Sequence, residues 1–561
     1  MEKGLEPIEQ ESPERERISS YPAMVSIVVF LLALFGCAAQ KDVQPGRAAI
    51  ASAHPLATEA GFEILTQGGN AFDAAVAVAA TLAVVEPYSS GLGGGGFFLL
   101  YRAHDRAEIF IDARETAPKA ATADMYEGDQ RASLDGALAA AIPGIPAALD
   151  WLTQRHGKLA LAQNFAPAFR YAARGFGVDQ RYANAAKSQQ ERLGGSVFLD
   201  EGEAPEAGFV LRQPRLANTL RTVAYQGRDG FYRGKIAREL VDSVREAGGI
   251  WSVDDLAQYE VIEREPLKFK YRDLAITAAP LPSSAGIALA QSLAILEYFP
   301  LETLRESEQA HLIVEAMRRA FEDRAEYLGS SSEIPVARLL KPSYARARAA
   351  TIDKDRATPS AELDAARPRG EHTTHFSIVD REGNRVAATL TINTAFGSGF
   401  IAGSTGVLLN NEMDDFATEP GKPNFYGLIT GEANAIQPGK RPLSSMAPTF
   451  IEDDRGLLIA GTPGGPRIIS QMLLAILDFA HQRDLEFIVS RPRYHHQYLP
   501  DWIAIEPDGF SEDWKQSLER KGHTVRTGKR RWGNMQAVFL DKRSGKVSAK
   551  SDPRGRSEVG F

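Results

Sequence analysis

The sequence predicts a large unit in which helices and strands are mixed. Helical and strand-like segments follow one another along the 561-residue chain, and no tandem repeat is visible. Hydrophobic residues make up 44% of the chain and charged residues 24%, a composition typical of globular proteins with a large core. The length alone would allow several domains of about 100–200 residues. The mixing of both patterns throughout the chain favours a single α and β unit instead.

Charge and cysteine content exclude several classes of function. The formal net charge is −8 and the isoelectric point is near 5.8. The basic residues are scattered, with only short clusters such as Lys529-Arg530-Arg531. Because nucleic-acid binding needs a basic patch or stripe, we expect no nucleic-acid partner. The chain has one cysteine, which excludes an intrachain disulfide and a Cys-x-x-Cys metal site.

That cysteine, Cys37, follows an apolar stretch of 13 residues, Met24 to Gly36. A membrane span needs about 20 apolar residues, so the stretch suits the core of a signal peptide better. Leu34-Phe35-Gly36-Cys37 resembles the lipobox of bacterial lipoproteins, in which the cysteine is acylated and becomes the mature N-terminus. We therefore expect a lipoprotein signal peptide at 1–36, a linker at 37–47 and a lipid anchor on the periplasmic side of a bacterial membrane. A plain signal peptide with a coincidental cysteine is the alternative.

Two helices are expected next. Leu56–Gln67 reads as a helix that a glycine pair ends. Asn70 and Asp73 are typical of a helix N-terminus and open an Ala/Val-rich helix that runs to Val85, just before a proline. Since the second helix is apolar on nearly all sides, it should be buried.

A glycine-rich run, Gly91-Leu92-Gly93-Gly94-Gly95-Gly96, precedes the apolar strand Phe97–Tyr101. It superficially resembles a dinucleotide-binding loop. However, it leads into a strand instead of joining a strand to a helix, and it lacks the G-x-G-x-x-G spacing. We therefore reject a dinucleotide site. A second strand, Ala107–Asp112, leads to Arg114.

Residues 140–330 are expected to be mainly helical. The clearest case is Ser307–Leu328, for which Ser307 is a suitable cap and a glycine follows the last residue. Its apolar stripe, at the spacing of one helix face, consists of Ile313, Ala316, Met317, Ala320 and Phe321.

From about residue 376 the pattern changes to strands. Phe376–Asp380 and Val386–Asn393 flank a glycine-containing turn and predict a β-hairpin. Because side chains alternate along a strand, Thr389, Thr391 and Asn393 share one face. That polar face beside Thr373 fits the lining of a cavity and equally fits a solvent-facing strand.

Several segments in a fixed order resemble the γ-glutamyltransferase family, from about residue 45 to the C-terminus. Six ordered blocks and one junction carry the resemblance, too many for a chance match. They are Gly91–Phe98, Asp112–Glu115, the junction Glu371–Phe400, Leu408–Phe416, Lys440–Thr449, Gly461–Ile468 and Ser551–Arg554.

The resemblance implies an α+β fold of the N-terminal-nucleophile hydrolase type, a four-layer αββα sandwich. It also implies that the chain cleaves itself at His372–Thr373 into a large subunit, 48–372, and a small subunit, 373–561, which form one heterodimeric unit. A hydroxyl is a poor nucleophile at its free pKa, and the α-amine of a terminal threonine can act as its base. Read alone, the pair Thr373-Thr374 also fits the start of an ordinary strand.

Matching the family's motifs to this sequence implies roles for single residues. Thr373 would be the nucleophile and form a γ-glutamyl ester, and Thr391 would hydrogen-bond its hydroxyl. Gly464 and Gly465 would present backbone N–H groups to the oxyanion, because glycine lets the backbone approach a substrate closely.

The same matching implies how a γ-glutamyl group would be recognised. This group carries an α-carboxylate and an α-ammonium on one carbon. Arg114 would grip the carboxylate with its planar fork, and the hydroxyls of Ser444 and Ser445 would donate to it. The ammonium would be bound by Asp415, Glu412 and Asn393.

Three further features complete the expected site. Pro420–Gly431 resembles the lid loop of many family members, and Tyr426 would close over the glutamyl group. The acidic segment around Glu412 and Asp415 also fits a solvated loop or a cation site, but the resemblance implies no metal and no cofactor. The adjacent His495 and His496 would point in opposite directions on a strand, so a structural role fits them better than metal ligation.

The expected function is that of a γ-glutamyltransferase or glutathione hydrolase. It would transfer the γ-glutamyl group of glutathione and similar compounds to water, amino acids or peptides. The closest alternative is an acylase of the cephalosporin-acylase or poly-γ-glutamate type. Asp415 argues against substrates without an ammonium, since its charge would stay unpaired in a dry pocket, and the lid argues against polymers. A non-catalytic binding lipoprotein is disfavoured because Thr373, Thr391 and Arg114 are all present.

Overall fold

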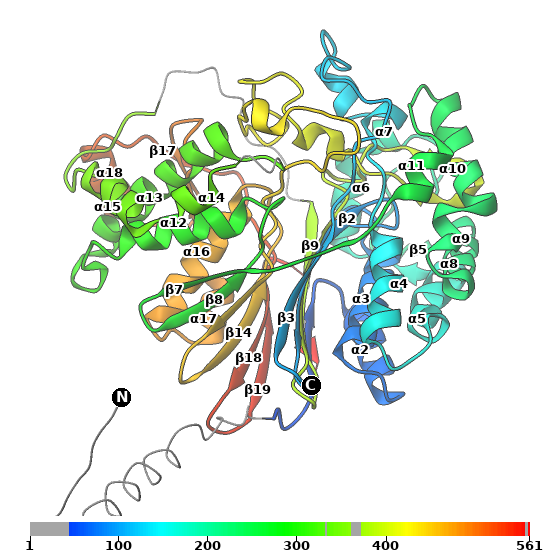
Figure 1. Ribbon diagram of the computed structural model, residues 1–561, viewed down its shortest axis with the longest axis horizontal. Coiled ribbons are helices and arrows are strands. Elements are labelled where there is room, and N and C mark those ends of the chain that lie inside the picture. Colours follow the sequence, from blue (N-terminus) through cyan, green and yellow to red (C-terminus); the bar gives the residue numbers. More distant parts are fainter. Residues whose placement is uncertain (1–43, 331–333, 361–371, 556–558, 561) are drawn as a thin grey trace, which may run out of the picture. The chain divides into compact units, whose positions relative to one another are not determined.

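The computed structural model describes residues 44–330, 334–360, 372–555 and 559–560. The described residues from Gln44 onward belong to one compact unit, built on two β-sheets between two layers of helices (Figure 1). The expected signal peptide and Cys37 lie outside the described residues. Within the described ranges, no helix combines the length and the hydrophobicity that crossing a membrane requires.

The first sheet has seven strands, and every pair of neighbours is antiparallel. In spatial order the strands are β20 (Val559–Gly560), β1 (Ala49–Ser52), β9 (Thr373–Val379), β10 (Arg385–Thr391), β2 (Gly95–Arg102), β3 (Ala107–Ala113) and β6 (Ile262–Arg264).

The second sheet has six strands and is also antiparallel throughout. Its strands, in spatial order, are β19 (Val547–Ser551), β18 (Gln536–Asp541), β14 (Gly456–Gly461), β13 (Thr449–Glu452), β8 (Leu274–Ala278) and β7 (Leu267–Tyr271). Small pairings outside the two sheets are made by β4 (Phe176–Gly177), β5 (Val210–Leu211), β11 (Ile401–Ala402), β12 (Val407–Leu408), β15 (Tyr494–His495), β16 (Ile503–Ile505) and β17 (Val525–Thr527).

One helical layer covers the first sheet and the other covers the second (Figure 1). The first layer and its surroundings contain α2 (Pro55–Thr66), α3 (Ala71–Val85), α4 (Ile145–His156), α5 (Leu161–Arg174), α6 (Gln180–Ser188), α7 (Gln190–Leu193), α8 (Pro214–Gln226), α9 (Asp229–Tyr232), α10 (Gly234–Glu246) and α11 (Val253–Gln258). The other side contains α12 (Ala285–Leu296), α13 (Glu306–Tyr327), α14 (Val336–Leu339), α15 (Pro342–Ala350), α16 (Arg467–Ala480), α17 (Leu485–Ser490) and α18 (Glu512–Arg520).

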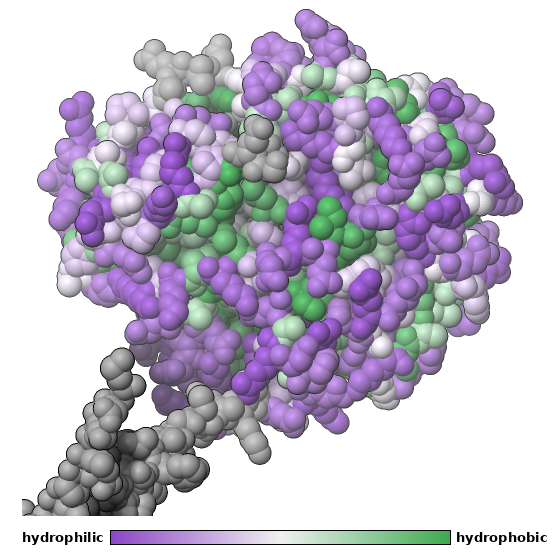
Figure 2. All heavy atoms as spheres, viewed as in Figure 1, coloured by the Kyte–Doolittle hydropathy of each residue, from purple (hydrophilic) through white to green (hydrophobic). Residues whose placement is uncertain are grey.

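The two hydrophobic cores show how the layers stack. On β2, Phe98 and Leu100 pack in the core beneath the α3 layer, whereas Phe97 and Leu99 belong to the core shared with the second sheet. Alternate side chains of a strand point to opposite faces, so β2 is buried on both faces and its sequence is a continuous apolar run. Figure 2 shows the outer surfaces over both helical layers as mainly hydrophilic, with hydrophobic residues gathered towards the middle. The expected four-layer αββα sandwich is therefore confirmed.

Both predicted subunits contribute strands to both sheets. In the first sheet β10, from the small subunit, lies between β9 and β2, and β2 belongs to the large subunit. In the second sheet β13 of the small subunit pairs with β8 of the large one. A cut between residues 372 and 373 would therefore leave every strand pair of these sheets in place.

Most of the expected elements are confirmed. The helix expected at 56–67 is α2, and the one expected at 70–85 is α3, which is buried along its whole length. Asn70 caps α3: its side chain accepts from the N–H groups of Phe72 and Asp73, while the Asp73 carboxylate accepts from the N–H of Asn70. The hairpin is formed by β9 and β10.

One expectation is met with an exception, and one needs correction. Residues 140–330 are mainly helical, as expected, but 262–278 contain the strands β6, β7 and β8; in Leu267–Tyr271, which is an edge strand, exposed and half-buried side chains alternate. The helix expected from Ser307 begins at Glu306, and Arg305 is its N-cap. The carboxylate of Glu308 accepts from the backbone N–H of Arg305 at 3.0 Å, so a glutamate reaching back satisfies the first turn.

The glycine run before β2 serves close packing. A Cβ on Gly93 would lie 2.0 Å from the carbonyl oxygen of Leu408, and one on Gly94 would lie 2.1 Å from that of Thr391. At Gly91 the nearest atom would be 3.7 Å away. Two glycines of the run thus let the chain pass against the last residues of β10 and β12.

This contrast predicts different effects of two equal substitutions. Gly94→Ala should destabilise the protein by about 1–3 kcal/mol, because the backbone must shift to relieve overpacking, and should lower its thermal midpoint. Gly91→Ala, in the same run, should stay within about 0.5 kcal/mol of the parent. Thermal denaturation of the two variants side by side checks this. Equal midpoints would show that the close approach at Gly94 is not a packing constraint.

Candidate functional site

Thr373, the first residue of β9, lies opposite Thr391, the last residue of β10. Thr373 Oγ1 donates a long hydrogen bond of 3.5 Å to Thr391 Oγ1. Thr391 Oγ1 donates in turn to the carbonyl oxygen of His372 at 3.2 Å and accepts from the N–H of Asn393 at 2.8 Å. The Thr391 hydroxyl therefore contacts both the Thr373 hydroxyl and the carbonyl of the peptide bond that precedes Thr373.

Thr374, the next residue on β9, points to the other face of the sheet and is hydrogen-bonded there. Thr374 Oγ1 donates to the carboxylate of Glu86 at 2.8 Å, and Tyr88 donates to the same carboxylate at 3.0 Å. Arg181 lies 3.3 Å from it. Burial raises the pKa of Glu86, although the Arg181 charge and these hydrogen bonds pull it down. Glu86 was not identified from the sequence. Its position between a helix expected to be buried and Pro87 could have indicated a buried acid.

Gly464 and Gly465 lie between β14 and the first turn of α16. Both have a positive φ, 138° and 55°, which favours glycine. A Cβ on Gly465 would also lie 2.7 Å from the ring of Tyr426. Neither backbone N–H donates to another described residue, and both lie where the partial positive charge of the helix N-terminus is felt. The pair is suited to receive an oxyanion.

Arg114 is the centre of a buried cluster of opposite charges. Its side chain is 1% exposed, with Nη1 2.8 Å from Glu412 and Nη2 2.5 Å from Asp415. Nε and Nη2 also donate to the carbonyls of Pro442 and Leu443 at 3.3 Å. The resemblance implies separate partners for Arg114 and Asp415; here they are paired with each other.

Two of the acids around Arg114, Glu412 and Glu115, hold their protons more tightly than usual. Burial raises the pKa of Glu412 well above its ordinary value, against the pull of Arg114. Burial likewise raises the pKa of Glu115 to about 7; its carboxylate lies 3.6 Å from Arg114. Burial would lower the pKa of Arg114, but the acids raise it overall. One guanidinium is thus shared among three carboxyl groups, so the cluster is poised to accept another cation.

The expected lid covers this cluster. Tyr426 is buried, and its hydroxyl donates to the carbonyl oxygen of Asn393 at 2.7 Å. The side chain of Gln497 donates to the carbonyl oxygen of Tyr426 at 3.2 Å. Asn393 itself has a positive φ of 73°, and its side chain donates to the carbonyl of Asn411. Tyr426 and the loop that carries it are therefore packed against the expected site.

One small cavity joins these parts. Its walls contain the expected nucleophile, the residues expected to bind both charges of the substrate, the lid tyrosine and one of the two glycines. The lining residues are Arg114, Arg324, Thr373, Thr391, Asn393, Glu412, Asp415, Tyr426, Leu428, Leu443, Ser444, Ser445, Met446, Gly465, Pro466 and Ile468. The structure therefore brings together all the expected substrate-binding residues. Arg324, on α13, was not anticipated; it is distant in sequence from every motif quoted for the site.

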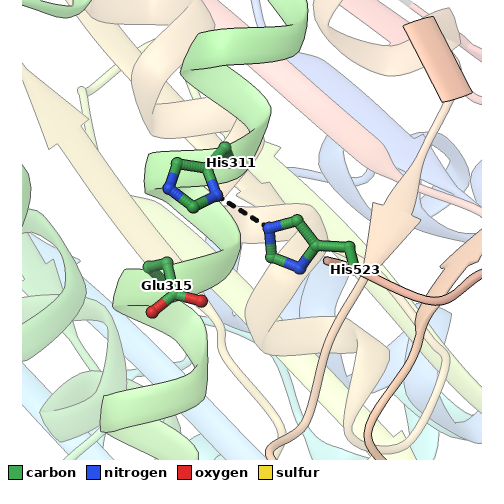
Figure 3. A group of neighbouring side chains, drawn as sticks. All are labelled: His311, Glu315 and His523. Carbon is green, nitrogen blue, oxygen red and sulfur yellow. Dashed lines mark hydrogen bonds between the residues drawn. The ribbon is translucent and has the colours of Figure 1, made fainter. Parts of the chain in front are cut away.

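Two histidines and a glutamate form a group with the residue types of a metal site. Within the described ranges, one group of ligand-type side chains lies close enough together, His311, Glu315 and His523, with ligand atoms within 4.8 Å of one another (Figure 3). His311 Nε2 lies 2.8 Å from the carbonyl oxygen of Asp353 and must carry the proton there. Nδ1 of His311 consequently accepts from Nε2 of His523 at 2.7 Å, so the two nitrogens satisfy each other.

Glu315 is equally occupied. Its two oxygens accept from Arg318, Arg319 and both donors of Thr358. Two guanidinium groups beside the carboxylate would repel a cation. The group fits a hydrogen-bonded connection between α13 and the segment after α18 better than a metal site.

His495 and His496 also have separate partners. His495 lies 2.5 Å from Ser470 Oγ and 2.8 Å from Gln497 Oε1, whereas His496 Nε2 lies 3.2 Å from Asp501. The two rings share no ligand position, in agreement with the structural role expected for them.

Comparisons with known proteins identify the family. The gamma-glutamyltranspeptidase family model matches residues 57–561. The glutathione hydrolase proenzyme of Escherichia coli (strain K12) is 39% identical over 532 residues, which cover 91% of this chain and 91% of that protein.

Two solved structures are similar as well. The cephalosporin acylase from Bacillus halodurans superposes with a TM-score of 0.81 at 25% identity, covering 98% of this chain and 99% of that chain. The gamma-glutamyltranspeptidase of Helicobacter pylori has a TM-score of 0.53 at 36% identity, covering 55% of this chain and 92% of that chain. On these grounds the chain belongs to the γ-glutamyltranspeptidase family and has the N-terminal-nucleophile hydrolase fold.

Proposed function

We propose that this protein is a glutathione hydrolase and γ-glutamyltransferase that activates itself by cleavage at His372–Thr373. The observation that carries the proposal is the position of the Thr391 hydroxyl, which contacts both Thr373 Oγ1 and the His372 carbonyl oxygen. The relatives' names supply the substrate class, since the E. coli relative is a glutathione hydrolase proenzyme.

Self-cleavage begins with attack of Thr373 Oγ1 on the carbonyl carbon of His372. The bond from this carbon to the Thr373 nitrogen breaks, the nitrogen takes the hydroxyl proton, and the acyl group moves to oxygen. Water then hydrolyses the ester and leaves a carboxylate on His372 and a free α-amine on Thr373. The Thr391 hydroxyl, which donates to the carbonyl oxygen, stabilises the charge that develops there.

The mature enzyme repeats this chemistry on its substrate. The α-amine of Thr373 takes the hydroxyl proton as Oγ1 attacks the γ-carbonyl. The N–H groups of Gly464 and Gly465 receive the oxyanion. The amine of the leaving group, cysteinylglycine when glutathione is the donor, takes the proton and departs. Water or the amine of an amino acid or peptide then attacks the γ-glutamyl ester and restores Thr373.

Recognition uses the buried charges. The α-ammonium of the substrate is placed with Asp415, Glu412 and Asn393, and the α-carboxylate with Arg114 and the hydroxyls of Ser444 and Ser445. The cluster holds three carboxyl groups beside one guanidinium, and burial raises the pKa of Glu412 and of Glu115. An incoming ammonium stabilises the ionised form of such acids, which favours a γ-glutamyl group over an acyl group without an ammonium.

The acylase alternative has one finding in its favour, the similarity to a cephalosporin acylase structure over nearly the full length of both chains. The H. pylori structure covers only 55% of this chain, so the two TM-scores compare different lengths of structure. Sequence identity is higher to the H. pylori protein, 36% against 25%. Together with the buried acids, this favours γ-glutamyl substrates.

We expect Thr373→Ala to give one uncut, inactive chain on a denaturing gel, because the attacking oxygen is gone. The unsubstituted protein should give two fragments, the smaller beginning at Thr373. Thr373→Ser, which keeps a hydroxyl, should still be cut and serves as the control. Normal cleavage of Thr373→Ala would end the self-cleavage hypothesis.

The substitution Asp415→Asn tests whether the carboxylate of Asp415 recognises the α-ammonium of the substrate. It should lower kcat/KM for glutathione by about 10- to 100-fold, since a charge-assisted contact to a buried group is worth about 1.5–3 kcal/mol. A glutaryl amide, which lacks the ammonium, should be a poor substrate before and after the change. Self-cleavage should persist, and Asp513→Asn on the exposed surface of α18 should behave like the parent. Equal activity of the parent on both substrates would support the acylase assignment instead.

A lipid anchor at Cys37 and a periplasmic location are further parts of the proposal. They rest on the apolar stretch 24–36 and the lipobox-like sequence that ends at Cys37. Two acyl chains give stable membrane attachment, whereas one chain is marginal.

Cys37→Ser should therefore move the protein from the detergent phase to the aqueous phase in phase-separation extraction, or leave the signal peptide uncut. The purified activity on glutathione should be unchanged, because Cys37 precedes the compact unit. If both forms distribute alike and both are processed, a plain signal peptide is the better interpretation.

A further inference from the structure

Arg324 is a buried cation in the wall of the same cavity. It lies near the C-terminal end of α13 and is 3% exposed. Arginine is rarely buried without a partner of opposite charge. Other buried arginines of this protein follow the rule: Arg319 pairs with Glu315 and Arg493 with Asp552. Among the described residues, no carboxylate lies within ion-pair distance of the Arg324 guanidinium.

The hydrogen bonds of Arg324 are few and neutral. Nε donates to Ser284 Oγ at 3.0 Å, and Nη2 donates to Ser445 Oγ over a long 3.4 Å. Nη1 has no partner among the described residues. Burial lowers the pKa of Arg324 to about 10, with Asp415 opposing the shift, so the side chain keeps its charge at neutral pH. A buried guanidinium with an unused donor group is costly unless an anion arrives.

The other guanidinium in the cavity, that of Arg114, already lies against two acids. In Arg114, Nη1 faces Glu412, Nη2 serves Asp415 and the Leu443 carbonyl, and Nε serves the Pro442 carbonyl. A carboxylate that bound to Arg114 would have to compete with these acids. Arg324 offers an incoming carboxylate a positive charge for which no protein acid competes.

The serines beside Arg324 fit the same ligand. Ser445 Oγ accepts from Arg324, and Ser444 Oγ accepts from the N–H of Met446 at 3.2 Å. Neither hydroxyl donates to another described residue, so both protons are available for an acceptor. Ser284 Oγ, which accepts from Arg324, donates to the carbonyl oxygen of Ser444 at 2.7 Å. Arg324 therefore also steadies the segment that carries both hydroxyls.

We propose that Arg324 is a specificity-determining residue that binds the α-carboxylate of the γ-glutamyl group through Nη1 and Nη2, together with Arg114, Ser444 and Ser445. This inference rests on the proposed function and deepens it. Arg114 is shared between the carboxylate and the acids Asp415 and Glu412, whereas Arg324 adds a second positive charge with which no acid among the described residues forms an ion pair.

The test compares two substrates on the self-processed enzyme: γ-glutamyl-p-nitroanilide and the same anilide with its α-carboxylate converted to a carboxamide. Arg324→Met should lower kcat/KM for the carboxylate substrate by about 10- to 100-fold, mainly through KM, and change the carboxamide substrate by less than about 3-fold. Arg346→Met, at an exposed position on α15, is the matched control and should leave both substrates unaffected.

Two further variants separate binding from positioning. Ser284→Ala breaks the link from Arg324 to the Ser444 carbonyl without touching the charge, so it should affect both substrates alike and weakly. Arg324→Lys keeps the charge but loses the fork, and it should show a smaller loss that is still selective for the carboxylate. If Arg324→Met fails to fold or to self-process, the selectivity of Arg324→Lys decides.

An equal loss on both substrates, or no loss, in the variants of Arg324 would overturn the proposal. Failure of the proposed function looks different. In that case the unsubstituted protein cleaves neither anilide, or it cleaves both equally well.

Discussion

The register between β9 and β10 is the constraint on which the site depends. It places Thr373 opposite Thr391, and a shift by one residue would turn every side chain to the other face. Buried hydrogen bonds specify it: His375 lies between Thr389 and Ser377, and Ser377 donates to the Gln536 carbonyl of the second sheet. Burial lowers the pKa of His375 to about 3, so this connection is neutral and insensitive to physiological pH.

If the chain cleaves itself as proposed, the same register explains how the two fragments stay together. Thr373 is the first residue of a strand that is paired on both sides, with β1 and with β10. The outer neighbours of the β9–β10 hairpin are β1 and β2, and both come from the segment before the cut. Breaking the bond at His372 frees an end of β9 without removing a hydrogen bond from its ladders. The new amine then stays beside the hydroxyl that it must deprotonate, because the sheet already fixes both.

Local patterns in the sequence were sufficient for the elements and for the motif residues, and they failed where partners are distant. The N-cap of α3 and the hairpin of β9 and β10 are encoded within a few residues. Gly464 and Gly465 are recognisable because a glycine pair stands within a short motif. Glu86 meets Thr374 across 288 positions, and Arg324 meets Ser445 across 121. No periodicity signals such contacts. The fold class beyond mixed α and β came from resemblance, and β6 to β8 were not anticipated because these short strands lie within a mainly helical region of the sequence.

The loop that carries Tyr426 covers the charged groups of the expected site, and this cover affects how a substrate binds there. Tyr426 covers Gly465, and its hydroxyl is held by the Asn393 carbonyl, next to the expected ammonium site. In the proposed function a substrate must reach Thr373, Gly465 and the buried acids, so the loop that carries Tyr426 has to open before the substrate binds. On closing, it removes water from a site with two guanidiniums and several carboxyl groups. In such surroundings charge interactions gain strength, and a ligand that supplies only one of the two charges leaves a buried group unpaired. Selectivity for a zwitterionic carbon therefore follows from closure as much as from any single contact.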